Sequence, residues 1–332
     1  MKSVYSRVIG IDVSKDTLQI SDSRSKLTGV IDNLVSAIKS MITKLKKYKG
    51  NVLVVCEATG GLEYDLVDLL HEAQIKVVIA NPAQMRHFAK GHGFLEKTDK
   101  IDAHVIRLFG EQVQTTPAAP RTPEQKRLTA LTRRRKQVID LLNQEKNRLG
   151  QCHFAETKLL IKETIENLVK QLESINLSLK DLIDEMAKTN RNISFLLGVK
   201  GIGYTTVATL LGELPELGSL SRTEIAKLVG VAPLTDKSGK QDNKRSIQGG
   251  RCTVRTALYL PTMSAMQHNA KISRFAKRLK RNGKPHKVVV TACMRKLITI
   301  LNQMIKNQTA WDGTKKGDER ASSSSPTCSI SS

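Results

Sequence analysis

Residues 8–13 have the sequence VIGIDV, a short run of mostly apolar, β-branched residues that carries Asp12 near its end. Residues 52–57, VLVVCE, form a second such run, which ends in Glu57. Short apolar runs bounded by polar residues or glycine are typical of buried strands. The sequence therefore predicts two core strands, each of which delivers a carboxylate near one end.

Strand and helix patterns alternate around these two runs, up to about residue 113. We expect strands near 5–20, 26–32, 51–57 and 75–80, and helices near 33–48, 62–73 and 98–112. This alternation is typical of an α/β domain. Three prolines, Pro117, Pro120 and Pro123, then indicate a linker.

Two further acids, Asp99 and Asp102, lie where the pattern of the 98–112 helix begins. Their spacing of three places both side chains on one helix face, so they can converge with Asp12 and Glu57 on one point. Carboxylate oxygens suit Mg²⁺ or Mn²⁺, and two such ions about 4 Å apart can stabilise the attacking and leaving oxygens of phosphodiester chemistry. A structural interpretation stays open, in which Asp99 caps the helix, Asp102 is a solvated first-turn acid and Glu57 marks an ordinary strand end.

The balance of charge points to a polyanionic partner. The chain has 54 Lys and Arg against 31 Asp and Glu, a net charge of +23 and a pI near 9.9. Nucleic acid is the expected partner of so basic a chain, with strong salt dependence. We expect no membrane association and a cytoplasmic protein, because no apolar stretch approaches the ~20 residues of a spanning helix and the N-terminus lacks a signal-peptide core.

Cysteine spacing argues against a zinc site or a disulfide framework. The five cysteines are scattered without CxxC spacing. We expect them to be reduced and mostly part of the core.

A long-helical region is predicted from about residue 124 to 190. Apolar residues alternate spacings of four and three from Ile161 to Met186, which is the seam of a coiled coil. Its partner is either the helix of residues 124–150, in an antiparallel hairpin, or the same seam of another chain. The basic run 133–136 on the first helix is either a solvated face or a phosphate contact.

A glycine-rich turn, 198–203 (GVKGIG), precedes an apolar helix over Thr205–Leu211. Backbone N–H groups that open onto a helix N-terminus favour a phosphate, and the turn resembles the hairpin of helix-hairpin-helix DNA-binding modules. A plain structural turn would have a similar sequence. The turn matches neither the P-loop nor the dinucleotide fingerprint, so we infer no nucleotide cofactor.

Residues 231–255 form a polar, glycine-rich, basic loop between two apolar helices. Ser238 precedes Gly239 and has cationic neighbours that could balance a phosphate, although Ser-Gly is also an ordinary turn dipeptide and Thr235 and Ser246 are equally eligible nucleophiles.

Residues 274–287 are the densest basic run, for which we favour backbone contact with nucleic acid. The residues from about 312 onward are expected to be disordered.

Together these motifs resemble the DEDD insertion-sequence transposases, the family described as bridge-RNA-guided recombinases, whose relatives include site-specific DNA invertases. The resemblance runs in order from about residue 7 to 305, and it is carried by IGIDVSK at 9–15, CEATG at 56–60, IANP at 79–82, KTDKIDA at 97–103, GIG at 201–203, SGK at 238–240, GGR at 249–251, VR at 254–255 and ALY at 257–259.

The resemblance implies a fold, a site and partners. The fold is an α/β N-terminal domain of the RNase H type, RuvC-like, followed by a coiled-coil insertion and a mainly α C-terminal domain. The four metal-binding acids of the family map onto Asp12, Glu57, Asp99 and Asp102, and its nucleophilic serine onto Ser238. The resemblance also implies Mg²⁺ or Mn²⁺, donor and target DNA, a guiding noncoding bridge RNA, and a dimer or tetramer. Two departures, Lys237 before the serine and the segment 240–244 after it, weaken the alignment of this loop but not the Ser-Gly match.

The predicted organisation is a metal-binding domain at 1–115, a linker and coiled-coil helices at 116–190, a transposase domain at 191–310 and a tail at 311–332. The predicted function is a transposase or recombinase that exchanges DNA strands through Ser238, without ATP. The alternatives are a Holliday-junction-type nuclease with water as nucleophile, a site-specific invertase, and a non-catalytic nucleic-acid-binding protein whose acids are structural.

Overall fold

A computed structural model describes residues 5–311 except for 95, 97, 235, 236, 239, 240 and 243–245, and describes only the backbone of 234, 237, 238, 241 and 242. The chain divides into two compact units, Met1–Pro123 and Glu124–Ser332. The predicted tail falls outside the described residues from 312 onward.

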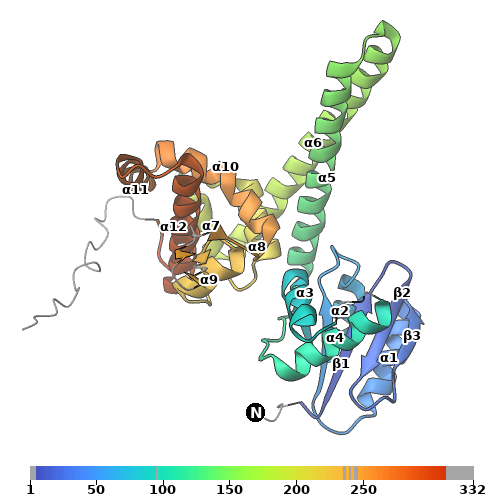
Figure 1. Ribbon diagram of the computed structural model, residues 1–332. Helices are drawn as coiled ribbons and strands as arrows, with labels where there is room; N and C mark the ends of the chain where they lie inside the picture. The colour runs from blue at the N-terminus through green and yellow to red at the C-terminus, as the bar shows by residue number, and fades with distance from the viewer. Residues whose placement is uncertain are drawn as a thin grey trace, which may run out of the picture. The chain divides into compact units, whose positions relative to one another are not determined.

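The first unit is built on a mixed five-stranded sheet with strand order β3-β2-β1-β4-β5 (Figure 1). The strand β1 is antiparallel to β2 and parallel to β4; β2 is antiparallel to β3 and β4 is parallel to β5. Its elements, in chain order, are β1 (Arg7–Val13), β2 (Thr17–Asp22), β3 (Gly29–Asp32), α1 (Val35–Lys46), β4 (Val52–Glu57), α2 (Tyr64–Glu72), β5 (Lys76–Ala80), α3 (Pro82–Gly91) and α4 (Asp99–Gln112). The α/β, RNase H-like fold predicted for this region is confirmed.

Alternation along β1 divides its side chains between two cores. Ile9 and Ile11 pack into the core that includes residues of α1 and α2, whereas Val8 packs on the other face with residues of α3 and α4. Successive strand residues point to opposite faces, so Gly10 and Asp12 share the face of Val8. Asp12 therefore belongs to the face that α4 covers.

The run at 5–20, predicted as strand, is two strands joined by a tight turn. The Ser14 hydroxyl donates to the carbonyl of Thr17 at 2.8 Å and accepts from its N–H at 3.1 Å. The sequence reasoning missed α3, although its start carries a clear signal: the Asn81 side chain accepts from the N–H of Ala83, and Pro82 follows the cap.

Gly10 is the point where α4 touches the sheet. A Cβ at this position would collide with the carbonyl oxygen of Ala103 and the N–H of Arg107, both backbone atoms of α4. Glycine is required here because only a residue without a side chain lets the helix backbone lie this close.

We expect Gly10→Ala to push α4 away from β1 at a cost on the order of 3 kcal/mol, since backbone atoms cannot rotate out of the way. Hydrogen–deuterium exchange should show this as a roughly 10²-fold loss of protection in peptides from β1 and α4. Gly91→Ala is the matched control, because nothing lies near its added Cβ. Equal protection in both variants would mean that α4 is not seated on Gly10.

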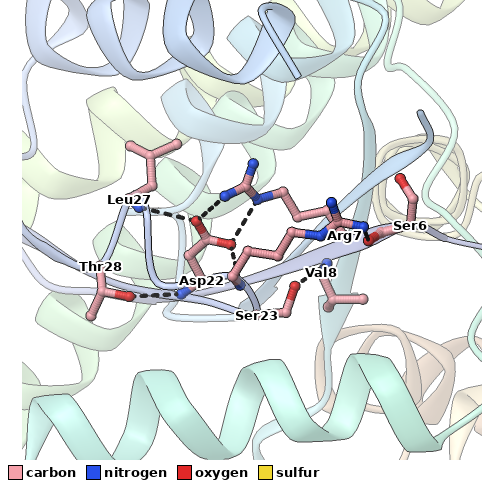
Figure 2. A network of polar contacts seen from close by, with 8 residues as sticks. Ser6, Arg7, Val8, Asp22, Ser23, Leu27 and Thr28 are labelled. Carbon is pink, nitrogen blue, oxygen red and sulfur yellow. Dashed lines mark hydrogen bonds and ion pairs between the residues drawn. The ribbon is translucent and has the colours of Figure 1, made fainter. Parts of the chain in front are cut away.

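Arg7 and Asp22 form a buried ion pair at the start of β1, away from Asp12 (Figure 2). Two guanidinium nitrogens of Arg7 donate to the two oxygens of Asp22 at 2.8 and 2.6 Å. The N–H groups of Arg24 and Leu27 donate to the same oxygens, each at 3.0 Å. Burial opposes the charge of Asp22, but these donors outweigh burial and lower its pKa below the ordinary value.

Asp22→Asn is expected to destabilise the first unit by about 3–5 kcal/mol, because it leaves the Arg7 charge buried without its partner. In the wild type the folded-state pKa of Asp22 is depressed, so the stabilisation is present above the unfolded-state pKa of about 3.9 and is lost as pH falls through the folded value. Urea unfolding from pH 3 to 7 measures both effects. Asp68→Asn is the control. Its ion pair with Arg121 is longer and more exposed, so the change should cost about 1 kcal/mol. A similar loss of stability in the two variants would mean that the Arg7–Asp22 pair has no special role in stability.

The second unit is mainly helical, as predicted. Its helices are α5 (Pro123–Gln151, which begins at the boundary of the units), α6 (Ala155–Thr189), α7 (Arg191–Leu197), α8 (Tyr204–Glu213), α9 (Arg222–Val229), α10 (Cys252–His268), α11 (Ala270–Arg281) and α12 (His286–Asn307). Its strands are β6 (Pro233–Leu234), β7 (Lys237–Ser238), β8 (Gln241–Asp242) and β9 (Ser246–Ile247).

The helices α5 and α6 pack against each other within one chain (Figure 1). Val138, Leu142 and Leu168 are buried between them, and Arg135 of α5 donates to the side chain of Asn176 of α6 at 2.8 Å. Of the two arrangements left open by the sequence, the structure contains the intrachain hairpin. A further contact between chains stays a prediction.

Helix α12 is the one described helix that is long and apolar enough to cross a membrane by length and composition. The expectation that no apolar stretch approaches the length of a spanning helix is therefore wrong for residues 286–307. Val289, Leu297 and Leu301 on this helix are buried in the core of the second unit, which is the position of a core helix in a globular domain.

Candidate active site

Asp12 and Glu57 lie side by side at the carboxyl ends of β1 and β4. The parallel register of these strands ends with Ile11 opposite Cys56, so Asp12 and Glu57 are the next pair along. Neighbouring strands are about 4.8 Å apart, and residues at matched register in a parallel pair point to the same face. The sheet therefore presents both carboxylates together, on the face that α4 covers.

Helix α4 runs antiparallel to β1 and brings its first turn toward Asp12. A Cβ on Gly110, near the end of α4, would collide with Val55 of β4 and lie 3.0 Å from Val8 of β1, whereas a Cβ on Gly10 would collide with Ala103 and Arg107. Val8 and Asp12 are separated by about 13 Å of strand, a length that equals about nine residues of helix. Counting back from Gly110 reaches the turn that holds Asp99 and Asp102.

The register puts Asp12 and Glu57 next to each other, and the direction of α4 leads its first turn toward the same edge of the sheet. That the four acids form one site stays a prediction. Asp99 is exposed and Asp102 is half-buried in the first turn of α4, whose cap Thr98 accepts from the N–H of Ile101 at 3.3 Å. Among the described residues, no three His, Cys, Asp or Glu side chains are close enough together to hold a metal ion as they stand. The topology of β1, β4 and α4 leads these acids toward one edge of the sheet, but the side chains of the described residues do not form a complete metal-binding site.

The donor chemistry of this edge nevertheless fits a magnesium ion. Mg²⁺ keeps several waters and is usually bound through one or two carboxylates together with substrate phosphates. Asp12 and Glu57 provide two carboxylates at adjacent register, and Asp99 and Asp102 provide two more on the facing helix. DNA phosphates would complete such a set.

Glu63 organises the loop that follows Glu57, and the sequence analysis missed it. Its carboxylate is almost fully buried and accepts from the N–H of Thr59 at 3.2 Å and the N–H of Gly61 at 2.8 Å. Burial raises the pKa of the neighbouring Cys56 thiol, and the Glu63 charge raises it further. Cys56 therefore stays a protonated core residue, and Glu63 holds the segment beside Glu57.

His104 and Arg107 follow Asp102 on α4 by two and five residues, about half a turn and one and a half turns. The Arg107 guanidinium donates to the Ser21 hydroxyl at 3.2 Å and to Glu111 at 2.5 Å, and lies 3.1 Å from His104 Nδ1. Burial lowers the pKa of His104, and the Arg107 charge lowers it further. His104 is consequently neutral at pH 7, and Arg107 ties α4 to β2.

The two ends of the loop that carries Ser238, at Gly230 and Gly249, form the base of this loop and are held together by side-chain and backbone contacts. The side chain of Arg255 donates to the carbonyl oxygen of Gly230 at 3.4 Å and to that of Gly249 at 2.5 Å, so one guanidinium bridges the two ends of the loop. A Cβ on Gly250 would collide with the backbone of Gly230. Gly230 and Gly250 both have positive φ, which only glycine adopts freely.

Ser238 itself is described only by its backbone. It lies in β7, opposite Gln241 of β8. Its side chain, and the whole of Thr235, lie outside the described residues, whereas Ser246 is exposed in β9. The assignment of Ser238 as nucleophile therefore stays a prediction.

The basic run 133–136 has partners within the chain. Arg133 pairs with Glu213 at 3.5 Å, Lys136 pairs with Asp140 at 2.8 Å, and Arg134 and Arg135 donate to side chains of α6. These contacts account for the run without a phosphate. The glycine turn between α7 and α8 is present as predicted, and its Val199 and Ile202 are buried in the core.

Two family models match successive parts of the chain. The DEDD transposase model matches residues 9–154, and the model of the IS116/IS110/IS902 transposase family matches residues 193–277.

Curated relatives extend the match over most of the chain. It is 27% identical to the pilin gene-inverting protein of Moraxella lacunata, over 92% of this chain and 97% of that protein. It is 26% identical to the pilin gene-inverting protein of Moraxella bovis over the same shares. Among solved structures, Thermus thermophilus RuvC aligns with 34% of this chain and 99% of that one, at 14% identity and a TM-score of 0.25. With both family models matched in order, the chain belongs to the IS110 family of transposases, which are DNA strand-transfer enzymes.

Proposed function

We propose that this transposase cleaves and exchanges DNA strands through Ser238, assisted by a divalent metal at the carboxylate edge of Asp12, Glu57, Asp99 and Asp102. The observation that supports the proposal is the adjacent register of Asp12 and Glu57 at the ends of β1 and β4. Helix α4, which begins with Asp99 and Asp102, packs against β1 at Gly10.

The chemistry balances without an external energy source. The Ser238 hydroxyl oxygen attacks the phosphorus of a DNA phosphodiester, forming a phosphoserine ester while one strand P–O bond breaks. The serine proton ends on the departing strand hydroxyl. A hydroxyl of the second DNA then attacks the phosphoserine and releases the serine, so one ester is exchanged for another at each step.

The acids of the first unit would hold Mg²⁺ or Mn²⁺, which supplies charge stabilisation at the scissile phosphate and at the leaving oxygen. Asp12 and Glu57 are held rigidly by the sheet, and the Thr98 cap fixes the start of α4. Under this proposal residues 1–115 are the metal-binding domain, 116–190 the linker and coiled coil, and 191–310 the domain that carries the serine.

We further propose that a noncoding bridge RNA selects the DNA partners and that the active assembly is a dimer or tetramer. The net charge of +23 supports a second polyanion beside DNA. Sequencing any RNA that copurifies with the protein tests this point; a preparation free of RNA that still exchanges strands at defined sites would contradict it.

An invertase that flips a chromosomal segment is the second candidate. It is favoured by the two pilin gene-inverting relatives, which match 92% of the chain. The central experiment serves both candidates: DNA carrying the gene's flanking sequences is incubated with protein and Mg²⁺, and products are resolved under denaturing conditions. Both candidates predict a covalent protein–DNA species, and the arrangement of the joined ends separates inversion from transposition. Cleaved DNA with no adduct would favour the junction nuclease instead.

A further inference from the structure

Two adjoining cavities in the second unit are lined by cations. The first, of about 310 Å³, lies between α11, α12 and the start of α9, and its charged lining residues are Arg222, Arg278, Arg295 and Lys296. The second, of about 300 Å³, shares Arg222 and Arg295, adds Lys227 of α9 and reaches Pro233 at the start of β6. Neither has an acidic residue among its described lining residues.

Within the part of the chain that the structure describes, the Lys227 charge acts on the carboxylate of Glu224, which lies about one turn away on the same helix. None of the five side chains makes an ion pair or a hydrogen bond there, in contrast to Arg251 of the same unit, which pairs with Glu216 at 2.5 Å. Burial lowers the pKa of Lys296, and repulsion from Arg278 and Lys271 lowers it further. An anion in the cavities would relieve this repulsion.

An aromatic ring holds two of the cations in place. Lys296 Nζ lies 4.3 Å from the centroid of the Phe275 ring, and the guanidinium carbon of Arg278 lies 5.3 Å from it. Cation–π contacts of this length order long side chains that would otherwise sample many rotamers. The cations are thus partly pre-positioned for a ligand.

We propose that the paired cavities bind the sugar–phosphate backbone of a nucleic-acid strand, with a phosphate in each cavity, close to the base of the serine loop. A guanidinium group can donate two parallel hydrogen bonds to the oxygens of one phosphate, and three of the five cations are arginines. Each volume is at the lower end of the roughly 300–1,000 Å³ of small-ligand pockets, which suits one phosphate and its sugar. The inference rests on the proposed function, because that function brings a nucleic acid to this unit.

The test is direct binding by the full chain. The double variant Arg295→Gln/Lys296→Gln removes two cations from the cavities. The matched control Lys188→Gln/Arg191→Gln removes one lysine and one arginine from exposed positions at the end of α6 and the start of α7, outside both cavities and outside the basic run 274–287. Fluorescent double-stranded DNA and single-stranded RNA of arbitrary sequence are titrated at several KCl concentrations, and the slope of log Kd against log salt is measured.

We expect the cavity variant to weaken binding at least about 10-fold and to reduce the salt slope by about 2, one for each lost phosphate contact. The control should change Kd by less than about 3-fold. Arg222 is exposed and lines both cavities, so Arg222→Gln should reduce the slope of log Kd against log salt by about 1. A loss on DNA alone or on RNA alone identifies the strand that occupies the site.

Equal losses in the cavity variant and the control would overturn the proposal, because they would show only a diffuse electrostatic field. An unchanged cavity variant would also overturn it. The cavity variant should melt within a few degrees of the wild type, because the loss of the Lys296–Phe275 contact and the relief of charge repulsion act in opposite directions. An unchanged melting temperature separates lost binding from misfolding. If the cavity variant binds more weakly than the wild type and the wild type forms no serine adduct with DNA, the proposed chemistry fails while the phosphate site stands.

Discussion

Asp12→Asn is expected to reduce strand exchange by about 10³-fold or more while the protein stays folded and still binds DNA. Asparagine keeps the size of the side chain, so the packing of β1 is preserved, but it removes the negative charge that a divalent cation requires at this edge. Loss of charge stabilisation in the transition state costs rate rather than binding.

Three measurements check this result together. Strand exchange should fall, and the DNA dissociation constant should change little. We expect Mn²⁺ to raise the melting temperature of the wild type but not of the variant, since a ligand of the folded state stabilises it only if it binds. Asp16→Asn is the matched control, because Asp16 is an exposed acid in the turn between β1 and β2. Full activity in Asp12→Asn would mean that the acids are structural and that the chain binds nucleic acid without this chemistry.

Ser238→Ala is expected to abolish the covalent protein–DNA species and to reduce strand exchange on the order of 10⁴-fold or more, because alanine has no oxygen to attack phosphorus. The variant should retain DNA binding and thermal stability. Trapping with DNA followed by denaturing electrophoresis measures the adduct, and mass spectrometry of the trapped peptide identifies the modified residue.

Ser246→Ala is the matched control in the same loop, and it should retain the adduct. If adduct formation is lost with Ser246→Ala and kept with Ser238→Ala, Ser246 is the nucleophile. If DNA is cut by both variants and no adduct forms in the wild type, water is the nucleophile and the nuclease alternative holds.

Much of the first unit could be predicted from its sequence because its signals are local. The runs at 8–13 and 52–57 became β1 and β4, as their apolar, β-branched composition indicates. Helix α3 was missed although Asn81-Pro82 carries a capping signal, because the apolar pattern of residues 82–91 is weak and Met85 is the one buried residue of the helix. The burial of Glu63 was also missed. Its partners Thr59 and Gly61 are within four residues, but the contact depends on a turn through Gly60 and Gly61, both with positive φ, that no apolar pattern indicates.

The second unit shows a different limit. Heptad spacing indicates that the α5 and α6 seams need partners, but the same spacing serves a hairpin or a dimer, and the contact of Arg135 with Asn176 decides for the hairpin within this chain. The sequence left the 133–136 run open as a solvated face or a phosphate contact. In the fold, Lys136 pairs with Asp140 one turn along the same helix, whereas the partner of Arg133, Glu213, is distant in sequence and is brought close by the fold.

The sequence by itself determined the α/β class of the first unit, the helical class of the second and the identity of the acids, because hydrophobic period and residue chemistry are properties of neighbouring residues. Only the tertiary structure decided that Asp12 and Glu57 end neighbouring strands and that α4 packs against the same face of the sheet, since this depends on the register of β1 with β4 and on the contact of α4 with Gly10. It also decided which cations face carboxylates and which line a cavity with no acidic residue among its described lining residues, because charge pairing is a matter of distance in space and not along the chain.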